Sequence, residues 1–247
     1  MALDPEKGSN TRAGQTTYDD LYADVLKWMQ KGWIDYLVPQ IYWHIGFDLA
    51  DHQILSIWWN ENSYGANIFI GHGAYRIGNH SAPEWNDPSE MPRQIRLNRS
   101  LHALYGSVFF SARSLFSNPL GFADSLSQAI YHYPALLPEY PQIEASPPPQ
   151  VIIRKLKNRK GGIRIKWKTE GPSKGYYYVL YRYEADEKTC FDHASHIAQI
   201  SPYRTQKLKM TDQPPQTNRT YKYVIRAVNE KHQEGPPSQE ASVLYKK

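Results

Sequence analysis

The sequence has little cysteine and no long apolar run. Its 247 residues include one cysteine, Cys190, which excludes an internal disulfide bond and any multi-cysteine metal site. No stretch approaches the about eighteen consecutive apolar residues that cross a bilayer, and the polar N-terminus predicts no signal peptide, so we expect no transmembrane segment. No G-x-G-x-x-G motif opens a predicted helix, and we expect neither a cofactor nor a bound metal.

Charge is divided unevenly along the chain. Residues 1–146 contain 9 Lys+Arg and 15 Asp+Glu, a net charge of −6, whereas residues 147–247 contain 20 and 9, a net charge of +11. A proline-rich run over 134–150 separates the two parts. We therefore predict one domain over 1–138, a Pro-rich linker over 139–150 and a second domain over 151–247.

The first part alternates amphipathic and apolar segments. Helical periodicity predicts a helix over 17–32, with Thr17 as N-cap and Gly32 at its end. Further helices are predicted near 51–62, 89–103 and 122–133, and strands at 34–43, 66–78 and 105–116. Apolar and polar residues do not alternate along these predicted strands, which is typical of parallel strands buried on both faces. This α(βα)₃ order belongs to an α/β fold, either a doubly wound sheet or a (β/α)₈ barrel.

In the second part, apolar residues recur at every second position. About seven short strands separated by turn residues predict an all-β sandwich of roughly 100 residues. The region resembles a fibronectin type III domain, since Trp167 takes the place of that family's strand-B tryptophan and TYKYVIRAVN (220–229) matches its strand F. The resemblance implies that Tyr221 is the tyrosine-corner residue and that the domain is a spacer or adhesion scaffold.

Five ordered segments of the first part match a second family. They are YDDLYADVLKWMQKGWIDYLVPQIYW (18–43), WWN (58–60), IFIGHGAYRIG (68–78), FSARSL (110–115) and NPLGFADSL (118–126). These segments resemble the C-terminal portion of the glycosyl hydrolase-like 10 family. The resemblance implies the last three βα units of a (β/α)₈ TIM-type barrel that acts on bacterial cell-envelope polysaccharide, namely peptidoglycan glycan strands.

The same resemblance predicts what the chain does not carry. The family's acidic Asp-Asp-Tyr segment has no counterpart here, so we expect the isolated chain to be inactive. The parent protein is expected to be exported to the periplasm or cell surface. Three strands cut from a barrel leave two open edges, so association with another chain that completes the barrel is also expected.

Substrate-binding residues are expected at the carboxyl ends of the strands, where the loops of such barrels converge. The candidates are Gln40, Tyr42, Trp43, His72, Tyr75 and Arg113, with His44, Arg76 and Ser111 on the same rim. Amide, imidazole and guanidinium groups can bond sugar hydroxyls, and aromatic rings can stack on pyranose rings. The alternative is structural: Tyr42 and Trp43 would cap a core, and His72 would be a hydrogen-bonded interior histidine.

No catalytic residue is identified from the sequence. Glycoside hydrolysis commonly uses two carboxyl groups that flank the scissile bond. The acids in or near loops are Asp48, Glu61, Glu84 and Asp87, but Asp48, Asp51 and Asp87 occupy positions typical of helix caps. Glu84, in the long loop after the second strand, is the candidate that remains closest to a site. A polysaccharide partner is expected. Nucleic acid is not, because Lys and Arg of the second part alternate with apolar residues as on a solvated sheet; the alternative for this basic part is attraction to anionic cell-wall polymers or a membrane surface. The alternative function is that of a non-catalytic glycan-binding or structural cell-envelope protein.

Overall fold

The chain folds as two compact units in the computed structural model. The structure describes residues 8–12, 14–171, 176–202 and 208–246. The units are Met1–His132 and Tyr133–Lys247, and each is described by itself. The division lies a few residues before the limit predicted at 138, because Leu136 packs against the core of the second unit.

A parallel sheet forms the centre of the first unit. Its strands are β1 (Tyr36–Leu37), β2 (Gln40–Ile41), β3 (Asn67–His72) and β4 (Leu104–Phe109). β1 and β2 pair in parallel with successive parts of β3, and β4 pairs in parallel with β3 as well. Three parallel strand positions result, as the sequence predicted.

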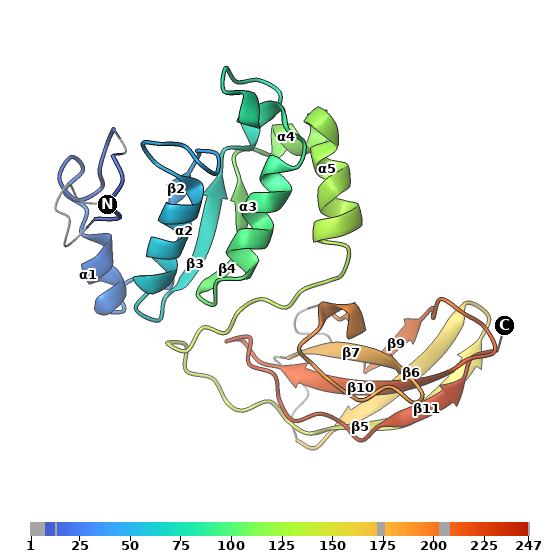
Figure 1. Cartoon of the computed structure of the whole chain (residues 1–247). Helices are drawn as coiled ribbons and strands as arrows, with labels where there is room; N and C mark the ends of the chain where they lie inside the picture. The colour runs from blue at the N-terminus through green and yellow to red at the C-terminus, as the bar shows by residue number, and fades with distance from the viewer. Residues whose placement is uncertain (1–7, 13, 172–175, 203–207, 247) are drawn as a thin grey trace. The chain divides into compact units, whose positions relative to one another are not determined.

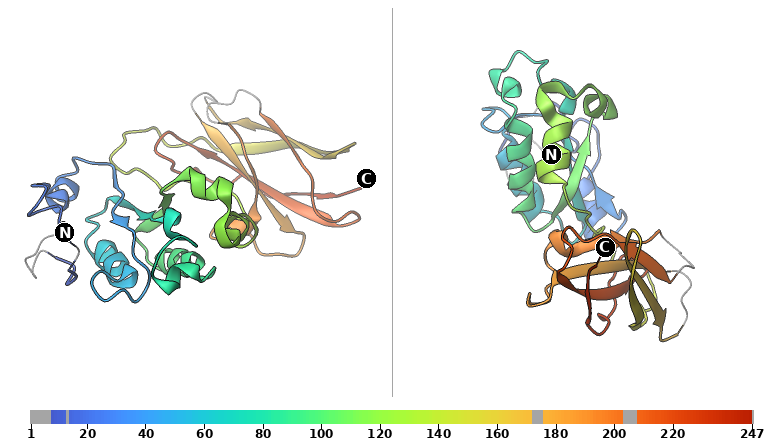
Figure 2. Two further views of the ribbon diagram at one scale, coloured as in Figure 1. Left: turned by 90° about the horizontal axis from the view of Figure 1, so that it is seen from above. Right: turned by 90° about the vertical axis from the view of Figure 1, so that its right-hand side faces the viewer.

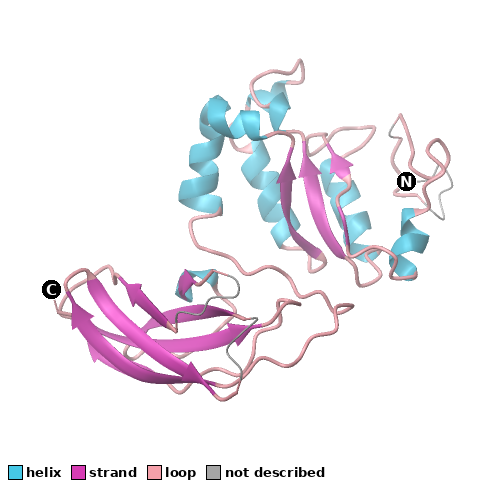
Figure 3. Ribbon diagram, turned by 180° about the vertical axis from the view of Figure 1, so that it is seen from behind, coloured by secondary structure: helices cyan, strands magenta, loops and turns pink. Residues whose placement is uncertain are grey.

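The helices of the first unit are α1 (Val25–Gln30), α2 (His52–Glu61), α3 (Glu90–Arg99), α4 (Ala112–Ser117) and α5 (Phe122–Ser125), which continues as a π-helical turn over Leu126–Ile130. Of these, α2 and α3 lie against one face of the sheet (Figures 1 and 3). Short 3-10 turns cover Ala74–Arg76, Pro83–Asn86 and Pro119–Gly121. Two apolar clusters between helices and sheet form the core, one around Leu55, Ile68 and Ile70 and one around Trp85 and Ile95.

The first predicted helix is much shorter than expected. α1 begins after Asp24, whose carboxylate accepts a hydrogen bond from the backbone N–H of Lys27, so Thr17 is not the N-cap. Tyr22 has a φ of 51°, a left-handed conformation that interrupts a right-handed helix. Gly32, with a φ of 64°, lies just beyond the end of the helix as predicted.

The strand predictions also need correction. The strand expected over 34–43 is broken between β1 and β2 because Pro39 has no N–H for the ladder. It is not buried on both faces, since Tyr36 and Gln40 are exposed. The strand expected over 105–116 ends at Phe109, and α4 begins at Ala112.

The helix ends agree in part with the predicted caps. Asp51 is the N-cap of α2, where its carboxylate accepts a hydrogen bond from the N–H of Gln53 at 2.7 Å. Asp87 is not the N-cap of α3, which is Ser89, but its carboxylate accepts hydrogen bonds from the N–H and hydroxyl of Ser89. Asp48 is exposed and caps no helix, so that expectation is wrong.

The second unit consists of two antiparallel sheets, as the period-two pattern predicted (Figure 2). The strands are β5 (Val151–Arg159), β6 (Gly162–Thr169), β7 (Tyr177–Glu184), β8 (Ile197–Ile200), β9 (Lys209–Asp212), β10 (Thr220–Val228) and β11 (Ala241–Leu244), with a 3-10 turn at Ala194–His196. One sheet has the order β11-β10-β7-β8 and the other β5-β6-β9. Trp167, Tyr178 and Tyr223 are buried in the core between them.

Candidate functional site

The sheet face opposite the helices is rich in aromatic side chains. In β3, Ile68 and Ile70 join the core beneath the helices, so Phe69 between them points to the other face. Tyr36 of β1 meets Phe69 edge to face, with ring centroids 5.8 Å apart. Phe110 follows β4 and is 59% exposed. Among the described residues of the first unit, no helix covers this face (Figure 3).

Three rings gather where β2, β3 and β4 end. Tyr42, Tyr75 and Phe110, which we call the aromatic cluster, have ring centroids 6.0 to 6.2 Å apart. Tyr42 and Phe110 are nearly parallel, at 26°, whereas Tyr75 stands almost perpendicular to both. Because the strands are parallel, their carboxyl ends lie at the same end of the sheet. The three rings therefore come together there.

Glycines allow two rings to approach the neighbouring strand closely. A Cβ on Gly73 would lie 3.0 Å from the Cβ of Tyr42, and a Cβ on Gly106 would lie 3.0 Å from the ring of Phe69. Both distances are shorter than ordinary contacts between carbon atoms. Because Gly73 and Gly106 have no side chain, the rings of Tyr42 and Phe69 can pack directly against the strand backbone.

The remaining predicted binding residues are divided between the two faces. Gln40 is exposed on β2, and Arg113 is exposed on α4. Trp43 is half-buried and packs against the core beneath the helices, so it lies away from the aromatic cluster. Of the other rim residues, Ser111 is half-buried, and Arg76 places its guanidinium 5.4 Å from the ring centre of Tyr75.

His72 lies in the interior, hydrogen-bonded at both ring nitrogens. Its Nδ1 is 3.0 Å from the Oε1 of Gln94, and its Nε2 is 3.1 Å from the hydroxyl of Ser107. Its ring stacks on those of His52 and Phe109. Burial lowers the pKa of His72 to about 3 and that of His52 to about 4, so both rings are neutral at pH 7. His72 is therefore a neutral interior side chain with no exposed surface.

Glu90 is a buried acid that the sequence analysis did not single out. Its Oε1 accepts hydrogen bonds from the N–H of Ile45 at 2.8 Å and the side-chain amide of Gln94 at 2.9 Å. Its Oε2 accepts one from Arg93 at 2.7 Å. Since Gln94 also bonds His72, a polar network joins the loop after β2 to α3 and β3. A Glu in the first turn of a helix is common, and so no pattern marked this one.

The other acids near this end of the sheet are exposed or already paired. Glu84 is partly exposed and lies 3.6 Å from Nε2 of His44. Asp87 forms an ion pair with Arg93 at 2.9 Å. Over the described ranges, no group of three or more His, Cys, Asp or Glu could hold a metal ion.

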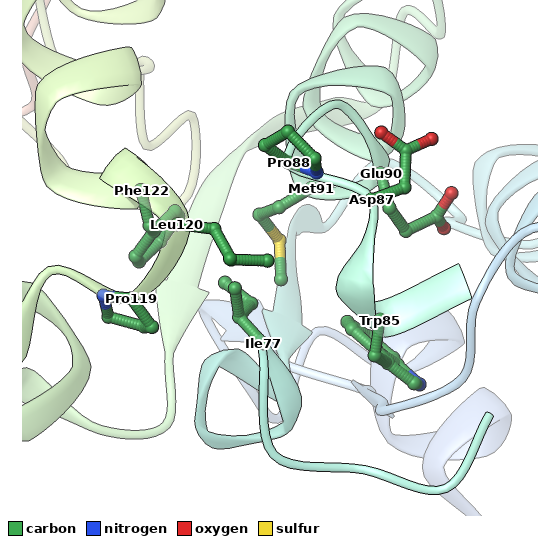
Figure 4. Close-up of a pocket in the computed structure, with 9 residues that line it drawn as sticks. All are labelled: Ile77, Trp85, Asp87, Pro88, Glu90, Met91, Pro119, Leu120 and Phe122. Atoms are coloured by element: carbon green, nitrogen blue, oxygen red, sulfur yellow. The ribbon is translucent and has the colours of Figure 1, made fainter. Parts of the chain in front are cut away.

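Two of the cavities lined by described residues of the first unit differ greatly in size. The cavity drawn in Figure 4 has a volume of about 10 Å³, room for about one water molecule, so Asp87 and Glu90 on its wall face no space for a sugar. A larger one of about 410 Å³ lies between the β1–β2 segment, residues 15–25 and α2, and Gln40 and Trp43 both line it. Most of its other lining residues are apolar, including Leu37.

Comparison with known proteins supports a glycosyl hydrolase-like family. Residues 4–87 match the model of the family described as Glycosyl hydrolase-like 10. The glycosyl hydrolase YngK of Bacillus subtilis is 36% identical over 245 residues, which cover 96% of this chain and 46% of that protein. The glycosyl hydrolase DigH of Escherichia coli K12 is 33% identical over 110 residues, which cover 42% of this chain and 25% of that protein. The chain thus spans about half or less of these relatives.

Solved structures match only distantly. A beta-1,2-glucanase from Parabacteroides distasonis has 21% identity and a TM-score of 0.30, covering 47% of this chain and 14% of its own. The FN1–FN3 domains of chicken CNTN1 have 17% identity and a TM-score of 0.32, covering 40% and 33%. These TM-scores are too low to carry an argument. Among the described helices, none is long and apolar enough to cross a membrane.

Proposed function

We propose that this chain is part of a glycoside hydrolase-like protein that acts on bacterial cell-envelope polysaccharide, and that the aromatic cluster contacts the glycan. The observation that carries the proposal is the position of Tyr42, Tyr75 and Phe110 at the carboxyl ends of parallel strands, where α/β enzymes bind substrates. Exposed rings offer apolar faces to the apolar faces of pyranose rings. Gln40 and Arg113 add exposed hydrogen-bonding groups.

The proposed substrate is the glycan strand of peptidoglycan, and the proposed location of the parent protein is the periplasm or cell surface. Both come from the family resemblance, and the named glycosyl hydrolases among the relatives support the reaction class.

We further propose that the parallel strands are the last three of a (β/α)₈ barrel that another chain or segment completes. An uncovered aromatic face supports this, because a closed barrel would bury that face inside. When alone, this unit is expected to associate or aggregate through its open edges.

The second unit is proposed to be a fibronectin type III domain that acts as a spacer. Its sheets, β5-β6-β9 and β11-β10-β7-β8, are consistent with a seven-stranded sandwich of this kind. The hydroxyl of Tyr221 donates to the carbonyl oxygen of Gln216 at 3.2 Å, a bond to a residue just upstream that suits a tyrosine corner.

Substituting Tyr75→Ala tests the glycan contact. We expect a loss of affinity of about tenfold for peptide-free peptidoglycan oligosaccharides, because one stacking face disappears from the cluster, a change of roughly 1.4 kcal/mol. The matched control is Tyr105→Ala, since Tyr105 is similarly exposed but lies at the opposite end of the sheet. Calorimetric titration showing equal affinities for both variants would contradict the proposed contact.

A second candidate function is non-catalytic glycan binding. It is favoured because the acids near the cluster are already engaged. The buried carboxylate of Glu90 accepts three hydrogen bonds, and Asp87 forms an ion pair with Arg93. We therefore expect purified 1–247 to release no reducing ends from peptidoglycan glycan strands. Release that Glu84→Gln abolishes would show that this chain catalyses hydrolysis, and the non-catalytic candidate would be discarded.

A further inference from the structure

The outer face of the β5-β6-β9 sheet carries cations directly opposite one another. Lys166 on β6 lies opposite Lys155 on β5 and opposite Lys209 on β9, which makes a row of three lysines across three strands. In the next row, Lys157 lies opposite Arg164. All five are exposed, because the side chains that alternate with them, such as Ile165, point into the core. With Lys168, the same alternation on β6 completes what we call the basic face: Lys155, Lys157, Arg164, Lys166, Lys168 and Lys209.

The basic face has no matching carboxylates. The ion pairs among the described residues of the second unit lie elsewhere, and they include Arg182–Asp212, Lys222–Glu240 and Arg226–Glu234. No residue of the basic face takes part in an ion pair within the described ranges. Glu170 continues the outward alternation, but only beyond the end of β6.

Such an arrangement is unfavourable for the fold by itself. Like charges directly opposite on neighbouring strands destabilise a sheet, and a merely solvated surface usually intersperses both signs. A row of three lysines therefore indicates a surface arranged to meet negative charge from outside the sheet.

We propose that the basic face binds a linear anionic polysaccharide, a sugar or polyol chain that carries a carboxylate or phosphate on successive repeats. Neighbouring strands are about 4.8 Å apart, and outward side chains along a strand are about 6.7 Å apart, so the cations form a grid rather than a pocket for one small anion. An extended polymer with repeated charges can contact several of them at once. The inference rests on the second unit alone and does not need the proposed glycan site of the first.

Other polyanions fit the same face less well. Single-stranded nucleic acid is bound with aromatic side chains that stack on bases, and the basic face includes none. A three-stranded sheet with long side chains is too broad for a DNA major groove of about 12 Å. Stable membrane attachment adds apolar insertion, and the large exposed apolar residues of this unit, such as Leu137 and Leu244, lie outside the basic face.

The substitution Lys166→Glu tests the proposal in the full chain, with Lys188→Glu as the matched control. Lys188 is exposed in the loop after β7, and either change lowers the net charge from +5 to +3. We expect Lys166→Glu to weaken binding of polygalacturonate or poly(glycerol phosphate) about thirtyfold, because the charge changes by two and each charge contributes roughly 1 kcal/mol near an anionic surface. The control is expected to change affinity less than about twofold. Comparing the two polymers separates carboxylate from phosphate as the recognised group.

A second measurement separates binding from folding. The new carboxylate would lie between Lys155 and Lys209, so Lys166→Glu is expected to raise the melting temperature of the second unit while it weakens binding. Lys166→Gln is the milder variant, and it is expected to weaken binding by a smaller factor. Equal losses for Lys166→Glu and Lys188→Glu would overturn the proposal. Tighter binding of duplex DNA or of phosphatidylglycerol vesicles than of either polymer would overturn it as well.

Discussion

Acidification from pH 7 to pH 5 is expected to lower the free energy of unfolding of the first unit by about 4 kcal/mol. His52 and His72 are fully buried, and burial lowers their pKa values to about 4 and about 3. In the unfolded chain both side chains titrate near the ordinary value of about 6.5. Below that pH the unfolded state binds two protons that the folded state does not, and stability therefore falls by about 1.4 kcal/mol per histidine and pH unit.

Urea titrations of the full chain at pH 7 and pH 5 measure this effect. His52→Gln removes one of the two groups, so the loss of stability between these pH values should be roughly halved. The comparison variant is His102→Gln, the same substitution at an exposed histidine. Equal stability at pH 7 and pH 5 would contradict the neutral, buried state of the pair.

Glu90→Ala is expected to destabilise the first unit by about 2–4 kcal/mol. The substitution leaves the N–H of Ile45 and the side-chain amide of Gln94 without their acceptor in a largely buried setting. Each unsatisfied buried donor costs about 1–3 kcal/mol. Arg93 contributes less, because its side chain is half exposed and water can replace the lost contact.

Glu90→Gln is the matched control, because its amide oxygen can still accept a hydrogen bond at the same place. We expect it to lose clearly less stability than Glu90→Ala in the same urea titrations. An alanine variant as stable as the parent chain would mean that the network of Glu90 and Gln94 does not hold the loop after β2 in place.

The order of helices and strands along the chain was predictable because its signals are local. Apolar residues that alternate with polar ones around Trp167 predicted the two-sheet unit. Three apolar runs separated by segments of helical periodicity predicted the parallel sheet. Helix α2 was predicted almost to the residue, since Asp51 is a strong N-cap ahead of a clear apolar stripe.

The errors occurred where backbone conformation overrides periodicity. The apolar spacing over 17–32 fits a helix, yet Tyr22 is left-handed and Asp24 starts the helix later. Pro39 broke a strand whose apolar neighbours looked continuous. Phe110 was not named as a site residue, although Ser111 and Arg113 in the same predicted strand were.

The orientation of His72 could have been read from the sequence. In β3, Ile68, Ile70 and His72 share one face by period two, and an apolar face on a parallel strand packs beneath helices. The same reasoning places Tyr42 with Gln40 on the opposite face of the neighbouring strand. Partners distant in sequence, such as Gln94 and Ser107 for His72, had no local signal.

The central claim, that the aromatic cluster contacts glycan, is tested most directly by mapping amide chemical shifts during titration with a peptide-free peptidoglycan oligosaccharide. We expect saturable shifts at Tyr75 and Phe110 in the cluster and at Gly73 beside Tyr42, and a titration midpoint about tenfold higher in Tyr75→Ala. Shifts confined to residues 133–247, with none in the first unit at saturation, would contradict it.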